Sequence, residues 1–164
     1  MKWLKQRLKK GRDKMSIEKV KMKGEWFIKL YGPDSELKQE ISGFNVVTTV
    51  GKEFIASFFN SAVAAASTFT AKYIAIGTDS TGEAIGNTAL GAESARTTGT
   101  ASYISGQIFQ VKATFTTGVG TGAIVEYGLL SSSSVGTLVA RDTESVINKG
   151  ANDTLTVVCQ LTVS

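Results

Sequence analysis

The charged residues within or beside apolar stretches are the first candidates for chemistry in this chain: Glu93, Arg96, Glu126, Arg141, Asp142 and Glu144. Two neighbouring carboxylates could serve as the acid and the base of a hydrolytic reaction. We favour the alternative that Arg96 or Arg141 neutralises Glu126, because a buried carboxylate without a partner is costly. We therefore interpret Glu93, Arg96, Glu126 and Arg141 as structural ion-pairing residues.

Histidine is absent from the 164 residues, and Cys159 is the single cysteine. This composition excludes imidazole catalysis, serine or cysteine nucleophiles activated by histidine, and the commonest zinc sites. Carboxylate, lysine or tyrosine chemistry passes the same test. Cys159 lies in an alternating apolar run, Leu155–Val163, which predicts a thiol packed in the core. We expect no catalytic residue, no cofactor and no enzymatic activity.

Two glycine-rich segments could hold a small ion. Residues 118–122 read Gly-Val-Gly-Thr-Gly, but neither a lysine nor a helical pattern follows, so a hairpin turn is favoured over a phosphate cradle. Residues 77–83 offer oxygen ligands for a cation such as calcium, but they lack the spacing of a helix-flanked calcium loop. We predict no metal site, and the sequence leaves cation binding by residues 78–91 open.

The elements that would position these residues are mostly strands. Apolar runs bounded by turn residues predict strands at 25–31, 36–41, 72–77, 107–116, 123–130, 137–142 and 153–163. Helical spacing of apolar residues predicts one helix within 51–66, and a glycine-rich stretch predicts a long loop at 78–91. We therefore expect a mainly β body over residues 24–164, an antiparallel β-sandwich or barrel-like domain with one packed helix.

The first 23 residues form a basic N-terminal arm. They hold ten Lys or Arg against two acids, a charge of +8, whereas the remaining residues hold eight bases against twelve acids, a charge of −4. Ordering twelve residues costs about 12–24 kcal/mol at roughly 1–2 kcal/mol each. The large apolar groups Trp3, Leu4 and Leu8 give back only about 1.5–3 kcal/mol each. We therefore expect residues 1–14 to become ordered on another chain, as a short amphipathic helix ending near Gly11, or on the acidic body of their own chain.

The arm contains candidate partner-binding residues of two kinds. Apolar anchors and basic steering groups together comprise Lys2, Trp3, Leu4, Lys5, Arg7, Leu8, Lys9, Lys10 and Arg12. Nucleic acid, a membrane surface and an acidic protein surface would all attract such a segment. We favour a protein partner. Because the sequence has neither a signal-peptide stretch nor an apolar run long enough for a membrane span, we expect a cytoplasm-like compartment and no membrane.

Six segments resemble, in the same order, a recurrent pattern of small structural proteins in the virions of tailed bacteriophages. They are NVVTTVG at 45–51, YIAIGT at 73–78, NTALGAESAR at 87–96, EYGLL at 126–130, GTLVAR at 136–141 and KGANDTLTV at 149–157. The resemblance covers residues 24–163 and leaves the basic arm outside it. Asp79 departs from the pattern, which usually has glycine there, and this suggests a different loop conformation.

The resemblance implies a symmetric, usually trimeric β-domain without enzymatic activity. We expect a capsid decoration (cement) protein of the virion, assembled in the host cytoplasm. Its body would self-associate as a homo-oligomer, with a trimer favoured, and its arm would bind the major capsid protein or another virion protein. A tail, neck or fibre-attachment protein is the rival within this class. A glycan- or ligand-binding β-domain is the alternative from another class, with Tyr73, Tyr103 or Tyr127 around a concave site.

Overall fold

The structure is a computed structural model that describes residues 21–58 and 71–164. The elements in this part of the chain are β1 (Met22–Tyr31), β2 (Leu37–Val47), α2 (Thr49–Ser57), β3 (Tyr73–Gly77), β4 (Glu93–Thr98), β5 (Thr100–Tyr103), β6 (Ile108–Phe115), β7 (Gly122–Leu130), β8 (Leu138–Lys149) and β9 (Thr154–Val163). The described residues are mainly β, with 57% of them in strands and 7% in the helix. This confirms the predicted fold class.

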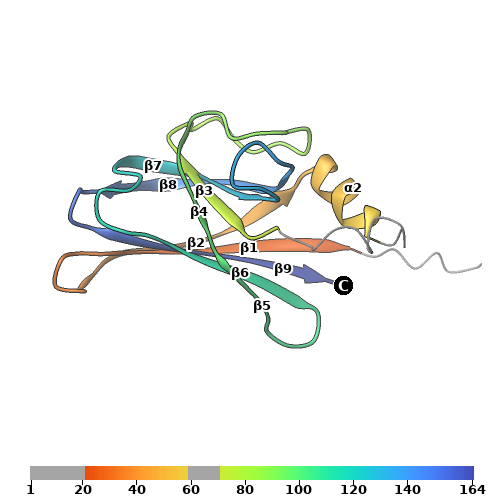
Figure 1. The fold of residues 1–164 in the computed structure, drawn as a ribbon, viewed down its shortest axis with the longest axis horizontal. Helices are drawn as coiled ribbons and strands as arrows, with labels where there is room; N and C mark the ends of the chain where they lie inside the picture. The colour runs from red at the N-terminus through yellow and green to blue at the C-terminus, as the bar shows by residue number, and fades with distance from the viewer. Residues whose placement is uncertain (1–20, 59–70) are drawn as a thin grey trace, which may run out of the picture.

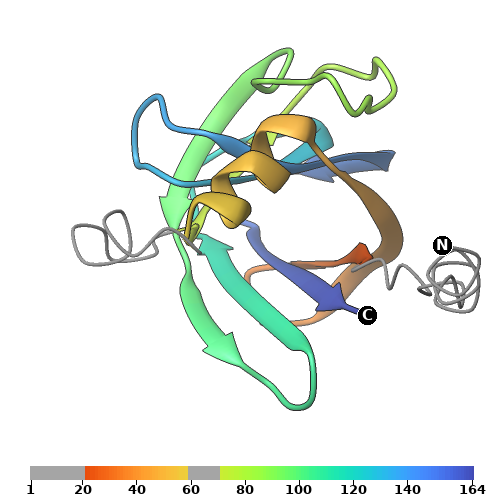
Figure 2. The same cartoon turned by 90° about the vertical axis from the view of Figure 1, so that its right-hand side faces the viewer.

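The strands form one antiparallel sheet in the order β4-β3-β7-β8-β2-β1-β9-β6-β5. In Figure 1, β2, β1, β9, β6 and β5 form the lower layer, and β7 and β8 lie above them with β3 and β4. Seen from the end, the strands surround an interior (Figure 2). Strands β2 and β8 join the layers through two residue pairs, Val46↔Arg141 and Val47↔Ala140. The sheet is therefore a nearly closed barrel.

Alternation of apolar and polar residues fills the barrel interior. In β1, Trp26, Ile28 and Leu30 are buried, and the residues between them face outward. Strand β9 lies beside β1 and follows the same period, with Trp26 paired to Cys159. Burial raises the pKa of the Cys159 thiol, which is free and fully buried. The predicted core position of this cysteine is confirmed.

Helix α2 lies across the end of the barrel that faces the viewer in Figure 2. Thr48 caps it, because its hydroxyl oxygen accepts a hydrogen bond from the Gly51 amide at 2.9 Å. Phe54 and Ile55 pack against the core. The sequence predicted this helix within 51–66. The helix begins two residues earlier, at Thr49, because Thr48 caps it. Residues 59–70 of the predicted range lie outside the described part of the chain.

The chain between β4 and β5 passes from one layer to the other at Gly99. The Gly99 amide donates to the Lys72 carbonyl at 2.6 Å. A Cβ at this position would lie 2.9 Å from the Lys112 carbonyl oxygen and 2.6 Å from Val111 Cγ1. Only glycine permits this close approach without displacement of β6.

Other parts of the sheet differ from the sequence prediction. Strands β4 and β5 were not predicted, because residues 93–103 show no apolar alternation. Strands β2 and β8 extend beyond their predicted ends, to Val47 and Lys149. The segment 118–122 is not a hairpin turn: β6 pairs with β5 and β9, whereas β7 pairs with β3 and β8. Local spacing identifies strands but not their partners. The loop at 78–91 contains no strand or helix, as predicted.

Replacing Gly51 with alanine gives opposite predictions from helix propensity and from packing. Propensity alone would stabilise the helix by roughly 1 kcal/mol. However, the new Cβ would lie 2.3 Å from the Val139 carbonyl oxygen. We expect Gly51→Ala to lower the free energy of unfolding by about 1–3 kcal/mol in denaturant titrations. Gly82→Ala is the control, because no atom lies within 4 Å of its added Cβ; a stabilised Gly51→Ala protein would contradict the packing.

Candidate functional site

The predicted partner-binding residues of the basic arm, Lys2 to Arg12, lie outside the described residues. The described chain begins at Lys21, whose amide donates to the Ser164 carbonyl at 2.6 Å. The arm therefore joins the body beside the end of β9. The remaining candidate residues lie in the body, where their contacts can be followed.

Glu126 on β7 and Arg141 on β8 form a buried ion pair. The Arg141 Nε and Nη2 atoms lie 2.8 Å and 2.7 Å from Glu126 Oε1, and the two side chains are 2% and 0% exposed. Two backbone amides also donate to this carboxylate, from Gly91 at 2.6 Å and from Ala92 at 3.1 Å. Both carboxylate oxygens thus accept hydrogen bonds from groups of their own chain, as expected for a buried charged group with a structural role.

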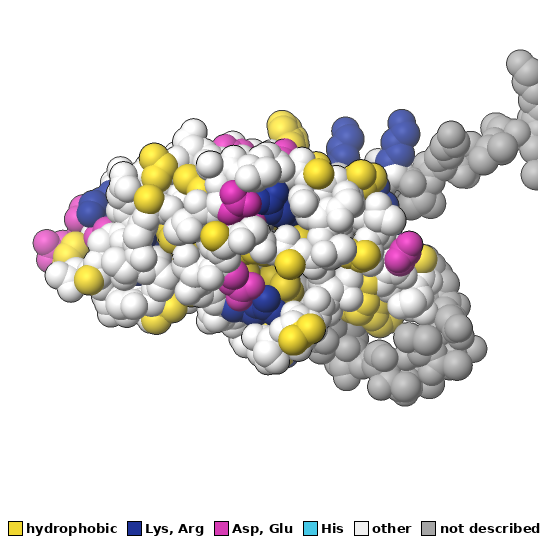
Figure 3. All heavy atoms as spheres, turned by 90° about the horizontal axis from the view of Figure 1, so that it is seen from above, with side chains coloured by type: hydrophobic (Ala, Val, Ile, Leu, Met, Phe, Trp, Pro, Cys, Tyr) yellow, Lys and Arg dark blue, Asp and Glu magenta, His cyan; other side chains and the backbone are white. Residues whose placement is uncertain are grey.

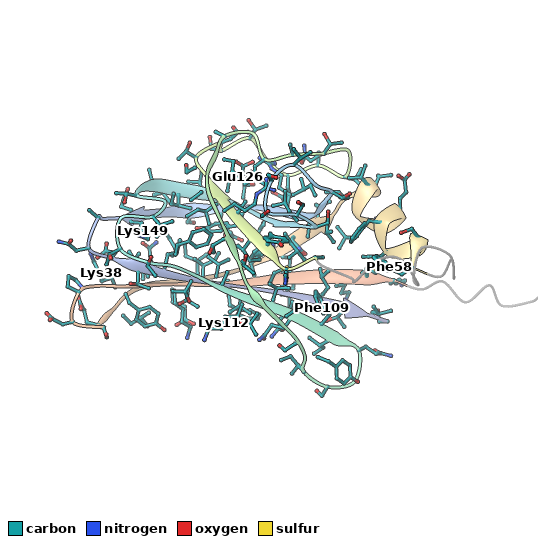
Figure 4. All side chains as sticks on the ribbon, viewed as in Figure 1. Lys38, Phe58, Phe109, Lys112, Glu126 and Lys149 are labelled. Atoms are coloured by element: carbon teal, nitrogen blue, oxygen red, sulfur yellow. The ribbon has the colours of Figure 1, made fainter. Side chains whose placement is uncertain are left out.

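Arg141 also fixes the loop 78–92 that lies above the sheet in Figure 1. Its guanidinium donates to the Thr81 carbonyl at 3.0 Å, to Asn87 Oδ1 at 3.3 Å and to Asp79 Oδ2 at 3.5 Å. Together with the two amides that bind Glu126, these contacts hold the loop at five residues. In Figure 4, Glu126 lies in the upper layer beneath this loop.

A small second core lies under the same loop. Leu90 packs against buried Ala75, Leu130 and Leu138, which belong to the face of the sheet that points away from the barrel interior. A Cβ at Gly128 would lie 2.3 Å from Leu90 Cδ1, so the leucine occupies the space that this glycine leaves. Both faces of the sheet are therefore covered over β3, residues 126–130 of β7 and residues 138–142 of β8.

Arg96 pairs with Glu93 on β4, and no hydrogen bond or ion pair joins it to Glu126 within the described residues. The Arg96 Nε and Nη2 atoms lie 2.9 Å and 2.6 Å from the two Glu93 oxygens. Its Nη1 donates to the carbonyls of Ser132 at 2.9 Å and Val135 at 2.7 Å. This pair holds the β7–β8 connection as Arg141 holds the loop 78–92. The sequence allowed Arg96 or Arg141 as the partner of Glu126, and in the structure the partner is Arg141.

Figure 3 looks down on this side of the molecule. The described part of this face is mostly uncharged, some of the basic side chains lie next to acidic ones, and neither charge forms a large patch. Within the residues that the structure describes, no three carboxylate or cysteine side chains are placed to hold a metal ion. The Asp79 carboxylate accepts hydrogen bonds from the Thr81 amide at 3.0 Å and from the Thr81 hydroxyl at 2.8 Å. These bonds lower the pKa of Asp79.

Asp142 points to the other face of β8, into the barrel, and the sequence did not indicate this environment. It is 1% exposed, and its Oδ2 makes no hydrogen bond within the described residues. The same holds for the Tyr127 hydroxyl and the Trp26 indole N–H, whose rings lie 6.1 Å apart. Burial, with the nearby carboxylates Glu144 and Glu83, raises the pKa of Asp142 to about 7.

The three tyrosines considered for ligand binding do not surround one concave site. Tyr127 is fully buried in the barrel. Tyr73 is half-buried and packs beside the second core. Tyr103 is 71% exposed on β5, and its hydroxyl donates to the Gly106 carbonyl at 2.5 Å. A fourth tyrosine, Tyr31, does line a hollow, although the sequence suggested it only as the end of a strand.

Comparisons of the chain with protein-family models, with curated proteins and with solved structures give no match. In the described residues, no helix is long and apolar enough to cross a membrane. Conclusions about function therefore depend on the contacts above and on the sequence motifs.

Replacing Glu126 with glutamine tests the structural role of the buried pair. The change leaves the Arg141 charge buried without its counter-ion, so we expect the free energy of unfolding to fall by about 3–5 kcal/mol. The control is Glu40→Gln, which breaks the exposed Lys29–Glu40 pair and should cost much less, because water screens exposed charges. Equal losses in denaturant titrations of the two variants would contradict the structural role.

Asp142 predicts an unusual pH dependence of stability. Folded Asp142 keeps its proton up to about pH 7, whereas the unfolded carboxyl ionises near its ordinary pKa of 3.8. The free energy of unfolding should therefore fall as the pH rises from about 4 to about 7, by up to roughly 4 kcal/mol at about 1.4 kcal/mol per pKa unit. Asp79 and Asp153, whose pKa values are lowered, act in the opposite direction below this window.

Urea titrations at several pH values measure this slope. The chain has no histidine to titrate in the same window. Asp142→Asn should flatten the dependence between pH 4 and 7, since the amide carries no titrating proton. An unchanged slope in this variant would show that another group is responsible.

Proposed function

We propose that the chain is a non-enzymatic structural protein of a bacteriophage virion, and that it decorates the capsid as a cement protein. The supporting observation is the position of the residues that carry the resemblance to phage virion proteins. Asn87, Glu126 and Arg141 come from three of these motifs, and they form one connected network. Glu93 and Arg96 form a second such contact with the β7–β8 connection. The charged motif residues thus stabilise loops, as a structural role requires.

The separation of charge along the chain supports attachment through the arm. The arm carries +8 and the rest of the chain −4, so it is drawn to acidic surfaces, and Trp3, Leu4 and Leu8 supply apolar anchors. Each arm adds a modest contact. Association of several bodies, with a trimer favoured, makes the contacts multivalent and raises the effective affinity. The partner that we propose is the major capsid protein or another virion protein.

Copy number distinguishes the two virion roles. Quantitative mass spectrometry of purified particles should find hundreds of copies for a capsid decoration protein. A handful to a few dozen copies would instead indicate a tail, neck or fibre-attachment protein. Absence of the protein from purified particles would contradict both.

Removing residues 1–14 tests the arm. We expect the shortened protein to keep its β-sheet circular dichroism and its unfolding transition, but to be absent from particles produced by a phage that encodes only this version. The matched variant combines Trp3→Ala, Leu4→Ala and Leu8→Ala, which keeps the charge and removes the anchors; it should also be lost. Lys19→Ser with Lys21→Ser is the control and should remain bound. Normal incorporation of the shortened protein would refute the role of the arm.

A salt titration separates protein from nucleic acid as the partner. Binding to nucleic acid would show a steep linear fall of log affinity with log salt concentration. We expect a shallow dependence for the full-length chain on purified shells, because apolar anchors contribute much of the contact. A steep dependence, together with equal affinity for naked DNA, would contradict the proposed protein partner.

A further inference from the structure

Three strand connections meet at the left end of the barrel in Figure 1, and they join β1 to β2, β6 to β7 and β8 to β9. Between them is an open hollow with a volume of about 550 Å³, within the range of about 300–1,000 Å³ that is usual for small-molecule sites. The side chains that line it belong to Tyr31, Pro33, Ser35, Thr117, Asn152 and Thr154. None of them is charged.

The polar side chains of this hollow are free to bind a ligand. Ser35, Thr117 and Asn152 are exposed, and Thr154 is half-buried. Among the residues that the structure describes, none of these side chains makes a hydrogen bond with another group. Hydroxyl and amide groups both donate and accept. Elsewhere on the body, by contrast, polar groups such as those of Arg141 are used to hold loops.

The backbone around the hollow is held in place before any ligand arrives. The Gly118 amide donates to the Ala151 carbonyl at 2.8 Å, which joins the β6–β7 loop to the β8–β9 turn. Lys38 on β2 pairs with Asp153 in that turn at 3.0 Å, and Lys38 is labelled at this end in Figure 4. The Gly150 amide donates to the same Asp153 carboxylate at 2.8 Å. Little ordering is therefore needed on binding, which favours affinity.

We propose that this hollow binds a neutral carbohydrate. The half-buried ring of Tyr31 provides an apolar surface for the C–H face of a sugar ring. Ser35, Thr117 and Asn152 match the hydroxyl groups of the sugar, which donate and accept in the same way. Of the charged groups beside the hollow, Lys38 and Asp153 pair with each other, and the Glu36 carboxylate, which lies against Gly32, would repel an anionic ligand.

The position of the hollow fits a protein that is attached through its arm. The arm joins the body at the start of β1, whereas Tyr31 ends the same strand. Ten residues at about 3.3 Å each separate the two points by roughly 30 Å. Attachment through the arm would leave the hollow accessible at the far end of the barrel. The proposed carbohydrate binding does not depend on the proposed virion role. It can therefore be tested with the purified protein, without phage particles.

The experiment is a titration of the ¹⁵N-labelled full-length protein with maltotriose, cellotriose, lactose and chitotriose, followed by amide chemical shifts. We expect at least one of these sugars to give saturable shifts that centre on Tyr31, Ser35, Thr117 and Asn152. Tyr31→Ala should weaken that binding by about tenfold. Asn152→Ala, a change at an exposed turn position that leaves the core intact, should weaken it several-fold.

Tyr103→Ala is the matched control, because it removes an exposed tyrosine at a distant strand, and it should bind the sugar as the unchanged protein does. Thermal unfolding tests whether each variant is folded. If Tyr31→Ala does not fold, the sugar affinity of Asn152→Ala decides the outcome. The proposal is overturned if none of the four sugars gives saturable shifts. It is equally overturned if the shifts centre elsewhere, or if folded Asn152→Ala binds with unchanged affinity.

Discussion

The buried ion pair between Glu126 and Arg141 is the interaction on which the upper layer of the barrel depends. The loop 78–92 has few large apolar residues and could not cover the sheet through hydrophobic contacts alone. Arg141 and Glu126 bind it at several backbone and side-chain groups, and Leu90 adds the apolar contact. Burying two charges is costly, and it is tolerated here because nearly every donor and acceptor of the pair has a partner. The pair therefore specifies one loop conformation.

This constraint explains why we propose a structural role for the motif residues. The Glu126 carboxylate is buried and accepts from Arg141 and from two backbone amides, whereas a catalytic acid or base must reach its substrate. The body then has two distinct ends. One end receives the basic arm, and the other carries three tied connections around a hollow whose polar groups are unused.

The sequence predicted the parts of the fold that depend on local periodicity. Alternation identified β1, β6 and β9, and helical spacing identified α2, because one buried face imposes each period. It missed β4 and β5, whose residues are mostly small or polar and are placed by pairing with β3 and β6. It could not decide which arginine neutralises Glu126, since strand pairing brings the two together. The hollow at Tyr31 was also missed, because its residues read only as a strand end and turns.

Native-state hydrogen exchange of the Gly91 and Ala92 amides tests the central claim most directly. These amides lie in a loop without regular structure, yet they donate to the buried Glu126 carboxylate. If the ion pair holds the loop on the sheet, both amides should exchange only in the same slow, cooperative opening as the amides of β7. Exchange as fast as that of exposed loop amides such as those of Ser105 and Gly106 would contradict the account.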